Sequence, residues 1–412
     1  METAILFLFS SDKYHNDAKK KAKYKKRQKI FKLNNESNKN MIPDDAKQIK
    51  IRDPSIEIIR ILAMFAIITN HIVAHNYLDL KYKKYKNQMN FILIICSWHV
   101  CGFALISGIV GYKSFKYSNL IYLWILVTFY SVAIYIYFKI FKFNTNKDSL
   151  ISEFFPVIFC KYWYFTQYFG MYLFLPAINK SVENLTKSEL KILSLSLIGL
   201  FIIWNDLINP KKDTFKLNRG YSVLSLLIFY IFGTYIGKYK NEYFGFNKIW
   251  ICSFCIFTFI CSSLLTHKLS IYDLNELTGL KLMIMKSLKQ LFTIKINSFP
   301  MMLQAISIIF FFKQIEYNKY ITKIINFIGP LTFSVYLIHE NILIMNNYVS
   351  LIFRRISNHL ALSSIIKILL FKVIKIYCIS LTIDYFRSLL FKFCYIKKIC
   401  LIIEKYLLKL LG

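Results

Sequence analysis

Residues 55–75, SIEIIRILAMFAIITNHIVAH, form the first stretch of the chain that is long and apolar enough to enter a bilayer. A helix turns by about 100° per residue, so Arg60 and His71 lie on nearly the same face, with His71 about three turns further along. A cation and a titratable imidazole are costly inside a membrane helix unless they are paired or serve a site. This segment therefore indicates the fold class and supplies the first functional hypothesis.

Apolar windows recur along most of the chain. Of its 412 residues, 56% are hydrophobic, and a window of roughly 17–25 apolar residues can span a bilayer as a helix. The connections are too short to fold a water-soluble domain. The sequence predicts an all-α, polytopic transmembrane helical bundle. About ten spans are expected, near residues 56–76, 91–111, 119–141, 162–179, 190–208, 221–238, 248–266, 296–313, 327–349 and 363–386.

Basic segments flank the predicted membrane domain, residues 53–387. The chain carries a formal net charge of +32, and a lysine-rich run lies before the first span. We expect residues 1–52 to be a disordered, basic cytosolic tail near anionic membrane lipids, with no nucleic-acid partner. Residues 388–412 predict an amphipathic C-terminal helix that lies in the interface, or an extra helix packed on the bundle. The expected location is the plasma (cell) membrane.

The cysteines and histidines do not predict a metal site. Nine cysteines, an odd number, lie mostly in apolar segments, which argues against a disulfide framework. Cys252 and Cys255 form a CxxC pair without the second pair or neighbouring histidine that tetrahedral zinc requires. His75, one turn past His71, has no acidic or cysteine partner on its own helix. We expect no metal ion.

The first span suits a long ligand with an anionic head and a reactive tip. With the N-terminus in the cytosol, Glu57 and Arg60 lie near the cytosolic mouth, and His71 lies roughly 16 Å deeper. A guanidinium can bind phosphate oxygens, and a neutral imidazole can act as a general base. Coenzyme A has this shape. The alternative is that Arg60 simply pairs with Glu57 and that His71 is bonded within the bundle.

Several segments together resemble the membrane acyltransferase 3 family. Residues 53–71, DPSIEIIRILAMFAIITNH, resemble its opening signature, with Arg and His at the family's spacing. Further matching segments follow in the expected order: FALISGIVGYKS (103–114), YWYFTQYFGMYLFLP (162–176), IFYIFGTYIGKY (228–239), SFPMMLQAISIIFFFK (298–313) and IGPLTFSVYLIHENI (328–342). The resemblance covers about residues 52–390.

This resemblance implies an integral membrane O-acyltransferase. It would transfer an acyl group, commonly acetyl, from cytosolic acetyl-CoA to a hydroxyl of a cell-surface glycan or a lipid-linked glycan precursor. Arg60 would bind the donor, and His71 would act as a general base or an acyl-relay partner. Where many members carry Arg-x-x-Arg after the second span, this chain has Lys113 and Lys116, which can neutralise phosphate without a bidentate fork.

Other candidates have both a functional and a structural interpretation. Ser107 is expected to line the acyl path, although the pair that it forms with Gly108 also permits close helix packing. His339, beside Glu340, is a second titratable group that could orient or deprotonate the acceptor, or make a structural hydrogen bond. Trp163 is expected to contact a sugar ring or the pantetheine arm, unless it belongs to an interfacial belt.

Tyr168 and Tyr172 carry the same two interpretations as Trp163.

The rival function is a transporter or flippase that moves a glycan-linked or acylated lipid without chemistry, since it would also use buried cations and aromatic sugar platforms. Such proteins often contain internal repeats, and the halves of this chain show no convincing repeat. Acyl-CoA and a glycan or lipid-linked acceptor remain the expected partners.

Overall fold

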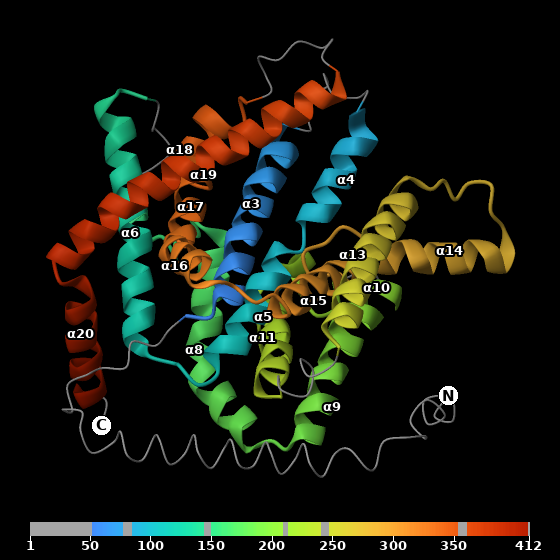
Figure 1. Cartoon of the computed structure of the whole chain (residues 1–412), viewed down its shortest axis with the longest axis horizontal. Coiled ribbons are helices and arrows are strands. Elements are labelled where there is room, and N and C mark those ends of the chain that lie inside the picture. The colour runs from blue at the N-terminus through green and yellow to red at the C-terminus, as the bar shows by residue number, and fades with distance from the viewer. Residues whose placement is uncertain are drawn as a thin grey trace. The chain divides into compact units, whose positions relative to one another are not determined.

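The computed structural model describes residues 52–76, 85–143, 150–208, 213–239, 247–352 and 361–410, and these residues form helices and no strands (Figure 1). They belong to one compact unit, Arg52–Gly412. The predicted basic tail lies outside the described residues, apart from Arg52. The all-α prediction is confirmed.

Twenty-one helical elements make up the described part of the chain. They are α3 (Pro54–Asn76), α4 (Lys86–Cys96), α5 (His99–Gly111), α6 (Tyr117–Ile140), α7 (Leu150–Phe154), α8 (Trp163–Asn184), α9 (Lys187–Ile198), the π-helix η2 (Gly199–Trp204), α10 (Asn205–Ile208), η3 (Asn218–Gly220), α11 (Val223–Lys238), α13 (Lys248–Ile271), α14 (Gly279–Leu291), α15 (Phe299–Lys313), α16 (Lys319–Ile328), η4 (Gly329–Leu331), α17 (Thr332–His339), α18 (Ile342–Ile344), the π-helix η5 (Met345–Val349), α19 (Leu362–Phe393) and α20 (Ile396–Leu410).

Six helical segments of the described residues are long and apolar enough to cross a membrane. They are Pro54–Asn76, Lys86–Gly111, Tyr117–Ile140, Lys187–Leu207, Lys248–Ile271 and Lys319–His339, and α11 and α15 are shorter apolar helices. Each of the predicted spans overlaps a helix. The count of about ten spans is not confirmed, because several of these helices are too short, too interrupted or too polar to cross a membrane by the criteria of length and apolarity.

Helix α3 contacts more of the bundle than a surface helix could. It packs against α4, α5, α15, α16, α17 and α19, and Ile59, Ile68 and Ile72 on it are fully buried. Its start is anchored, because Asp53 accepts a hydrogen bond from the Ser55 amide and binds Lys313 of α15. Burial opposes the charge on Asp53, but the hydrogen bond and charge of Lys313 outweigh it, so the pKa of Asp53 lies below its ordinary value.

Helices α5 and α11 touch backbone to backbone. A Cβ atom at Gly108 would lie 2.0 Å from the carbonyl oxygen of Tyr230, and one at Gly233 would lie 2.2 Å from that of Leu105. Gly237 meets the Ile109 carbonyl oxygen in the same way, at 2.5 Å. Glycines spaced four apart on α11 thus provide the small-residue surface that close packing of membrane helices requires.

The predicted span 327–349 is broken, whereas the predicted span 91–111 lies within the apolar segment Lys86–Gly111 and contains a turn. A turn at Ser97 separates α4 from α5, and the Ser97 hydroxyl accepts a hydrogen bond of 3.0 Å from Asn70 of α3. The segment 327–349 passes through the 3-10 turn η4 at Pro330 and stops after α17, where Asn341 caps α18 by accepting from the Leu343 amide. Hydropathy does not detect these breaks because the residues around them remain mostly apolar.

The C-terminal part consists of two helices rather than one tail after residue 387. Helix α19 continues to Phe393, and Tyr395, in a left-handed conformation (φ 52°), separates it from α20. Helix α20 packs along α6 through its buried residue Cys400 and exposes most other positions. Its apolar and basic positions therefore face the surroundings of the bundle.

We expect Gly108→Ala to destabilise the protein by about 1–3 kcal/mol, because the new methyl group meets a carbonyl oxygen that cannot rotate away. Gly199→Ala is the matched control, since no atom lies within 4 Å of the position that a Cβ would take there, and its backbone is helical. Unfolding of both variants in detergent, followed by intrinsic fluorescence, measures the difference. Equal stability of the two variants would contradict the close packing.

Candidate active site

Helices α3 and α17 bring two histidines and a carboxylate together. Nδ1 of His71 lies 3.1 Å from Nε2 of His339 and 2.7 Å from Oε2 of Glu340. His339 is buried, whereas the side chains of His71 and Glu340 remain 16% and 17% exposed. Glu340 is the C-cap residue of α17, and its amide still donates to the Tyr336 carbonyl oxygen at 3.0 Å. The structure thus brings the two predicted site residues His71 and His339 into contact, and it places Glu340 beside them.

The hydrogen bonds of this cluster assign the tautomers. Nδ1 of His339 lies 2.6 Å from the carbonyl oxygen of Val335, and a carbonyl can only accept, so this nitrogen carries the proton. Nε2 of neutral His339 is then an acceptor, and Nδ1 of a neutral His71 carries the proton that lies between this nitrogen and the Glu340 carboxylate. The lone pair of His71 therefore lies on Nε2, to which no described residue is bonded. Glu340 is close enough to stabilise a positive charge on the His71 ring.

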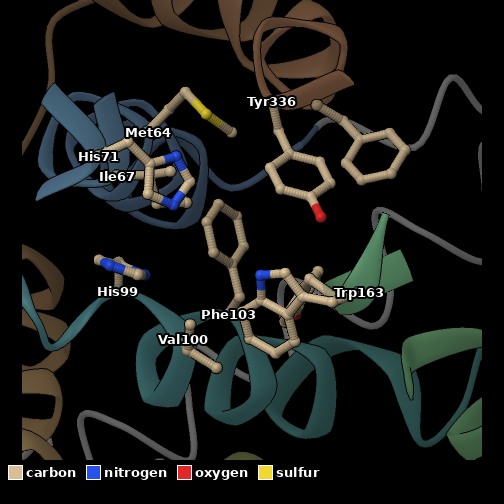
Figure 2. Close-up of a pocket in the computed structure, with 10 residues that line it drawn as sticks. Met64, Ile67, His71, His99, Val100, Phe103, Trp163 and Tyr336 are labelled. Carbon is tan, nitrogen blue, oxygen red and sulfur yellow. The ribbon is translucent and has the colours of Figure 1, made fainter. Parts of the chain in front are cut away.

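His71 lines a small cavity between α3, α5, α8 and α17 (Figure 2). The cavity has a volume of about 40 Å³, and its other walls are mostly apolar and aromatic: Met64, Ile67, His99, Val100, Phe103, Trp163, Tyr164, Phe333 and Tyr336. A water molecule needs roughly 10–15 Å³. The cavity thus has room for a group of two or three heavy atoms beside the His71 ring.

His99 is a cavity residue that was not predicted from the sequence. It is buried at the first position of α5, and its Nδ1 has no hydrogen-bond partner among the described residues. The sequence does contain an indication of His99, because a histidine in this apolar segment is as unusual as His71 in the first span. The first-turn amides of a helix lack acceptors within the helix, so this end of α5 also brings a positive dipole end to the cavity.

Arg60 lies on the same helix as His71 and pairs with Glu57, as predicted by the structural interpretation of Arg60. Glu57 accepts from Arg60 at 2.7 Å and from Arg52 at 3.2 Å, and it is itself buried. Arg60 stays 27% exposed. Glu57 shares its carboxylate between two cations, so it orients Arg60 and leaves a net positive charge at this end of α3. Its burial does not favour direct contact with a substrate.

A row of tyrosines on α8 extends from the neighbourhood of Arg60 to the cavity. Tyr164, Tyr168 and Tyr172 are four residues apart and share one helix face, with ring centroids 6.1 and 6.0 Å apart. Arg60 is near enough to Tyr164 and Tyr168 to act on both electrostatically. Tyr164, which also lines the cavity, was not singled out from the sequence, although the same spacing would have included it.

The remaining candidates lie around this row. The Ser107 hydroxyl donates to the Phe103 carbonyl oxygen at 2.8 Å and approaches Tyr168. Tyr172 donates to the backbone carbonyl oxygen of Lys116 at 3.0 Å. Lys113 and Lys116 are both exposed on the connection between α5 and α6, and the structure shows no direct contact of either ammonium group with Arg60.

Trp163 lines the cavity at the start of α8 and packs against a second aromatic ring that was not predicted. The ring centroid of Tyr221 lies 4.4 Å from that of Trp163, and Tyr221 is 41% exposed. Tyr221 begins the predicted span 221–238, far from Trp163 in the sequence, so local spacing gave no indication of this contact. The pair forms an exposed aromatic surface at the edge of the cavity.

The same three side chains are also the ones that could hold a metal ion. Within the described residues, one ligand atom from each of His71, His339 and Glu340 lies within 4.8 Å of the others. Ligands about 2.0–2.1 Å from a tetrahedral zinc ion lie about 3.3 Å apart. The separation of 2.7 Å between His71 and Glu340 is instead that of a direct hydrogen bond, so the arrangement favours an acid–base cluster.

Comparison with known proteins identifies the chain as an acyltransferase. The acyltransferase domain family, of the acyltransferase 3 type, matches residues 53–381, which is most of the chain and includes every residue of the cavity. Neither the curated proteins nor the solved structures give a match. The family supports transfer chemistry over the transporter alternative. With its apolar spans, the chain is therefore an integral membrane acyltransferase that belongs to the acyltransferase 3 family.

Proposed function

We propose that the protein transfers an acetyl group from acetyl-CoA to a hydroxyl of a cell-surface glycan or of its lipid-linked precursor. One observation carries the chemistry: His71 lines the cavity while its Nδ1 lies within hydrogen-bond distance of both His339 and Glu340, which leaves Nε2 of the neutral ring as the basic nitrogen. A base positioned in this way can remove the proton of an acceptor hydroxyl.

In the proposed reaction, Nε2 of His71 takes the proton as the acceptor oxygen attacks the thioester carbonyl carbon. The positive charge on the ring lies beside the Glu340 carboxylate, which stabilises it. The tetrahedral intermediate then collapses with cleavage of the carbon–sulfur bond, and His71 returns the proton to the thiolate. The products are an acetyl ester and free coenzyme A. The N-terminal end of α5, at His99 and Val100, would stabilise the developing oxyanion.

The size of the cavity supports acetyl as the transferred group. An acetyl group has three heavy atoms, and the cavity of about 40 Å³ accommodates about that number beside His71. Phe103, Trp163 and Tyr336 close the cavity with rigid rings, so a longer acyl chain would have to displace an aromatic side chain. Trp163 and Tyr221 offer the exposed rings on which a sugar of the acceptor could stack.

The donor is proposed to enter from the Arg60 end of α3. Arg60, with Lys113 and Lys116 on the neighbouring connection, would bind its phosphates, and Ser107, Tyr168 and Tyr172 would line the path of the pantetheine arm toward His71. The lysine-rich segment before the first span supports a cytosolic N-terminus. This orientation puts Arg60 on the side of the plasma membrane where acetyl-CoA is made.

We expect His71→Gln to lower kcat by about 10²–10⁴, the usual contribution of a general base, with little change in affinity for acetyl-CoA. His75→Gln is the matched control, because His75 is exposed one turn further along the same helix and is outside the cavity. Release of free thiol and formation of labelled ester by purified protein in nanodiscs measure both. A folded His71→Gln protein with wild-type turnover would refute the role of His71.

We expect Arg60→Lys to raise KM for acetyl-CoA by about 10-fold with kcat nearly unchanged, because a charged hydrogen bond contributes about 1.5–3 kcal/mol and lysine loses the guanidinium fork. Arg60→Ala should raise KM further. The two variants are compared over a range of acetyl-CoA concentrations at fixed acceptor. An unchanged KM in both would assign Arg60 to structure alone.

The direct contact between His71 and Glu340 also predicts that turnover does not require a divalent cation. We expect activity and thermal stability to survive extended dialysis against EDTA, and metal analysis of the purified protein to find no stoichiometric zinc. Loss of activity that zinc restores, together with one bound zinc per chain, would instead make the cluster a metal site.

A further inference from the structure

A basic cup lies apart from the cavity at the junction of α6, η4, α19 and α20. It has a volume of about 450 Å³ and is lined by Tyr122, Pro330, Leu331, Arg387, Ser388, Phe391, Lys392, Tyr395, Lys397 and Lys398. The three lysines are exposed, and none of them is paired with a carboxylate of the described residues. This cup shares no residue with the cavity at His71.

An apolar trough begins next to the cup and continues along α6 and α19. Its volume is about 540 Å³, and its walls are Phe129, Tyr130, Ala133, Ile134, Tyr137, Phe138, Ile338, Ile344, Tyr348, Ile383, Phe386, Arg387 and Leu390. Several of these side chains are exposed although they are large and apolar, among them Phe386 at 64% and Tyr348 at 49%. The trough therefore opens on an exposed apolar surface.

Arg387 lines both spaces and is held rigidly where they meet. Its guanidinium donates to Asp384 through Nε at 2.8 Å and through Nη2 at 2.7 Å, and through Nη1 to the Tyr122 hydroxyl at 3.0 Å. Asp384 also accepts from Tyr130 at 2.7 Å. Because Asp384 neutralises Arg387, the net charge of the cup comes from Lys392, Lys397 and Lys398. Lys397 lies over the Tyr122 ring, 5.8 Å from its centroid.

We propose that the cup and trough together bind an anionic phospholipid, with its phosphate headgroup among the lysines and an acyl chain along the trough. Charge complementarity favours this ligand, since an unpaired basic cluster at a membrane interface attracts anionic headgroups. The trough adds a requirement for a hydrophobic chain that a free phosphate or the phosphates of coenzyme A would not meet. The lipid would fasten the end of α19 and α20 to α6, independently of the proposed acetyl transfer.

The test measures lipid retained by the full-length protein in mild detergent, by native mass spectrometry with added phosphatidylglycerol or phosphatidylcholine. Lys397→Ala/Lys398→Ala removes two charges from the cup, and Lys405→Ala/Lys409→Ala removes two charges from the same helix outside it. We expect phosphatidylglycerol binding to fall about 30-fold in the first variant, from the contribution of each lysine near an anionic surface, and less than twofold in the second. Phosphatidylcholine binding should not distinguish them.

A second pair of variants tests the trough. Ala133→Trp would fill it, whereas Ile136→Trp adds the same side chain to an exposed position of α6 outside it. We expect only Ala133→Trp to weaken phosphatidylglycerol binding, and inorganic phosphate not to displace the lipid. Displacement by inorganic phosphate with no effect of Ala133→Trp would indicate a free-phosphate site and overturn the proposal. Unchanged lipid binding in Lys397→Ala/Lys398→Ala with a raised KM for acetyl-CoA would assign the cup to the donor, and would equally overturn it.

Discussion

The contact between His71 on α3 and the end of α17 is the interaction on which the rest of the site depends. Polar groups inside an apolar bundle are costly unless they are paired, and here the pairing also decides which nitrogen of His71 is basic. Val335 fixes the proton of His339, His339 fixes that of His71, and Glu340 supplies the compensating charge. Glu340 reaches this contact from the last turn of α17, where its amide still donates to the Tyr336 carbonyl oxygen.

His71 and Arg60 could be selected as candidates from the sequence because the selection follows from a local cost, that of a titratable group in an apolar helix. The same reasoning indicated His339 and would have indicated His99. The contacts themselves could not be predicted, since His71 and His339 are 268 residues apart and no periodicity relates them. Family resemblance supplied the order of the segments but not their geometry.

The fold was predictable to the same extent. Hydropathy measures the cost of transferring side chains into lipid, so it located the apolar helices and gave the all-α class. It carries no information on backbone direction, and it therefore merged α4 with α5, and α17 with α18. The polar residues at these breaks, Ser97 and Asn341, are bonded to Asn70 and to Tyr162, so they cost little in an apolar setting. Both breaks lie beside residues of the site.

The backbone contact between α5 and α11 has a consequence for access to the cavity. No layer of side chains lies between these helices that could repack, so the wall formed by His99 and Val100 is stiff. Any widening of the cavity must then come from its other walls, on α3, α8 and α17. A movement of α17 away from α3 would also separate His339 and Glu340 from His71. The contact between the two histidines would then be complete only while the cavity is closed.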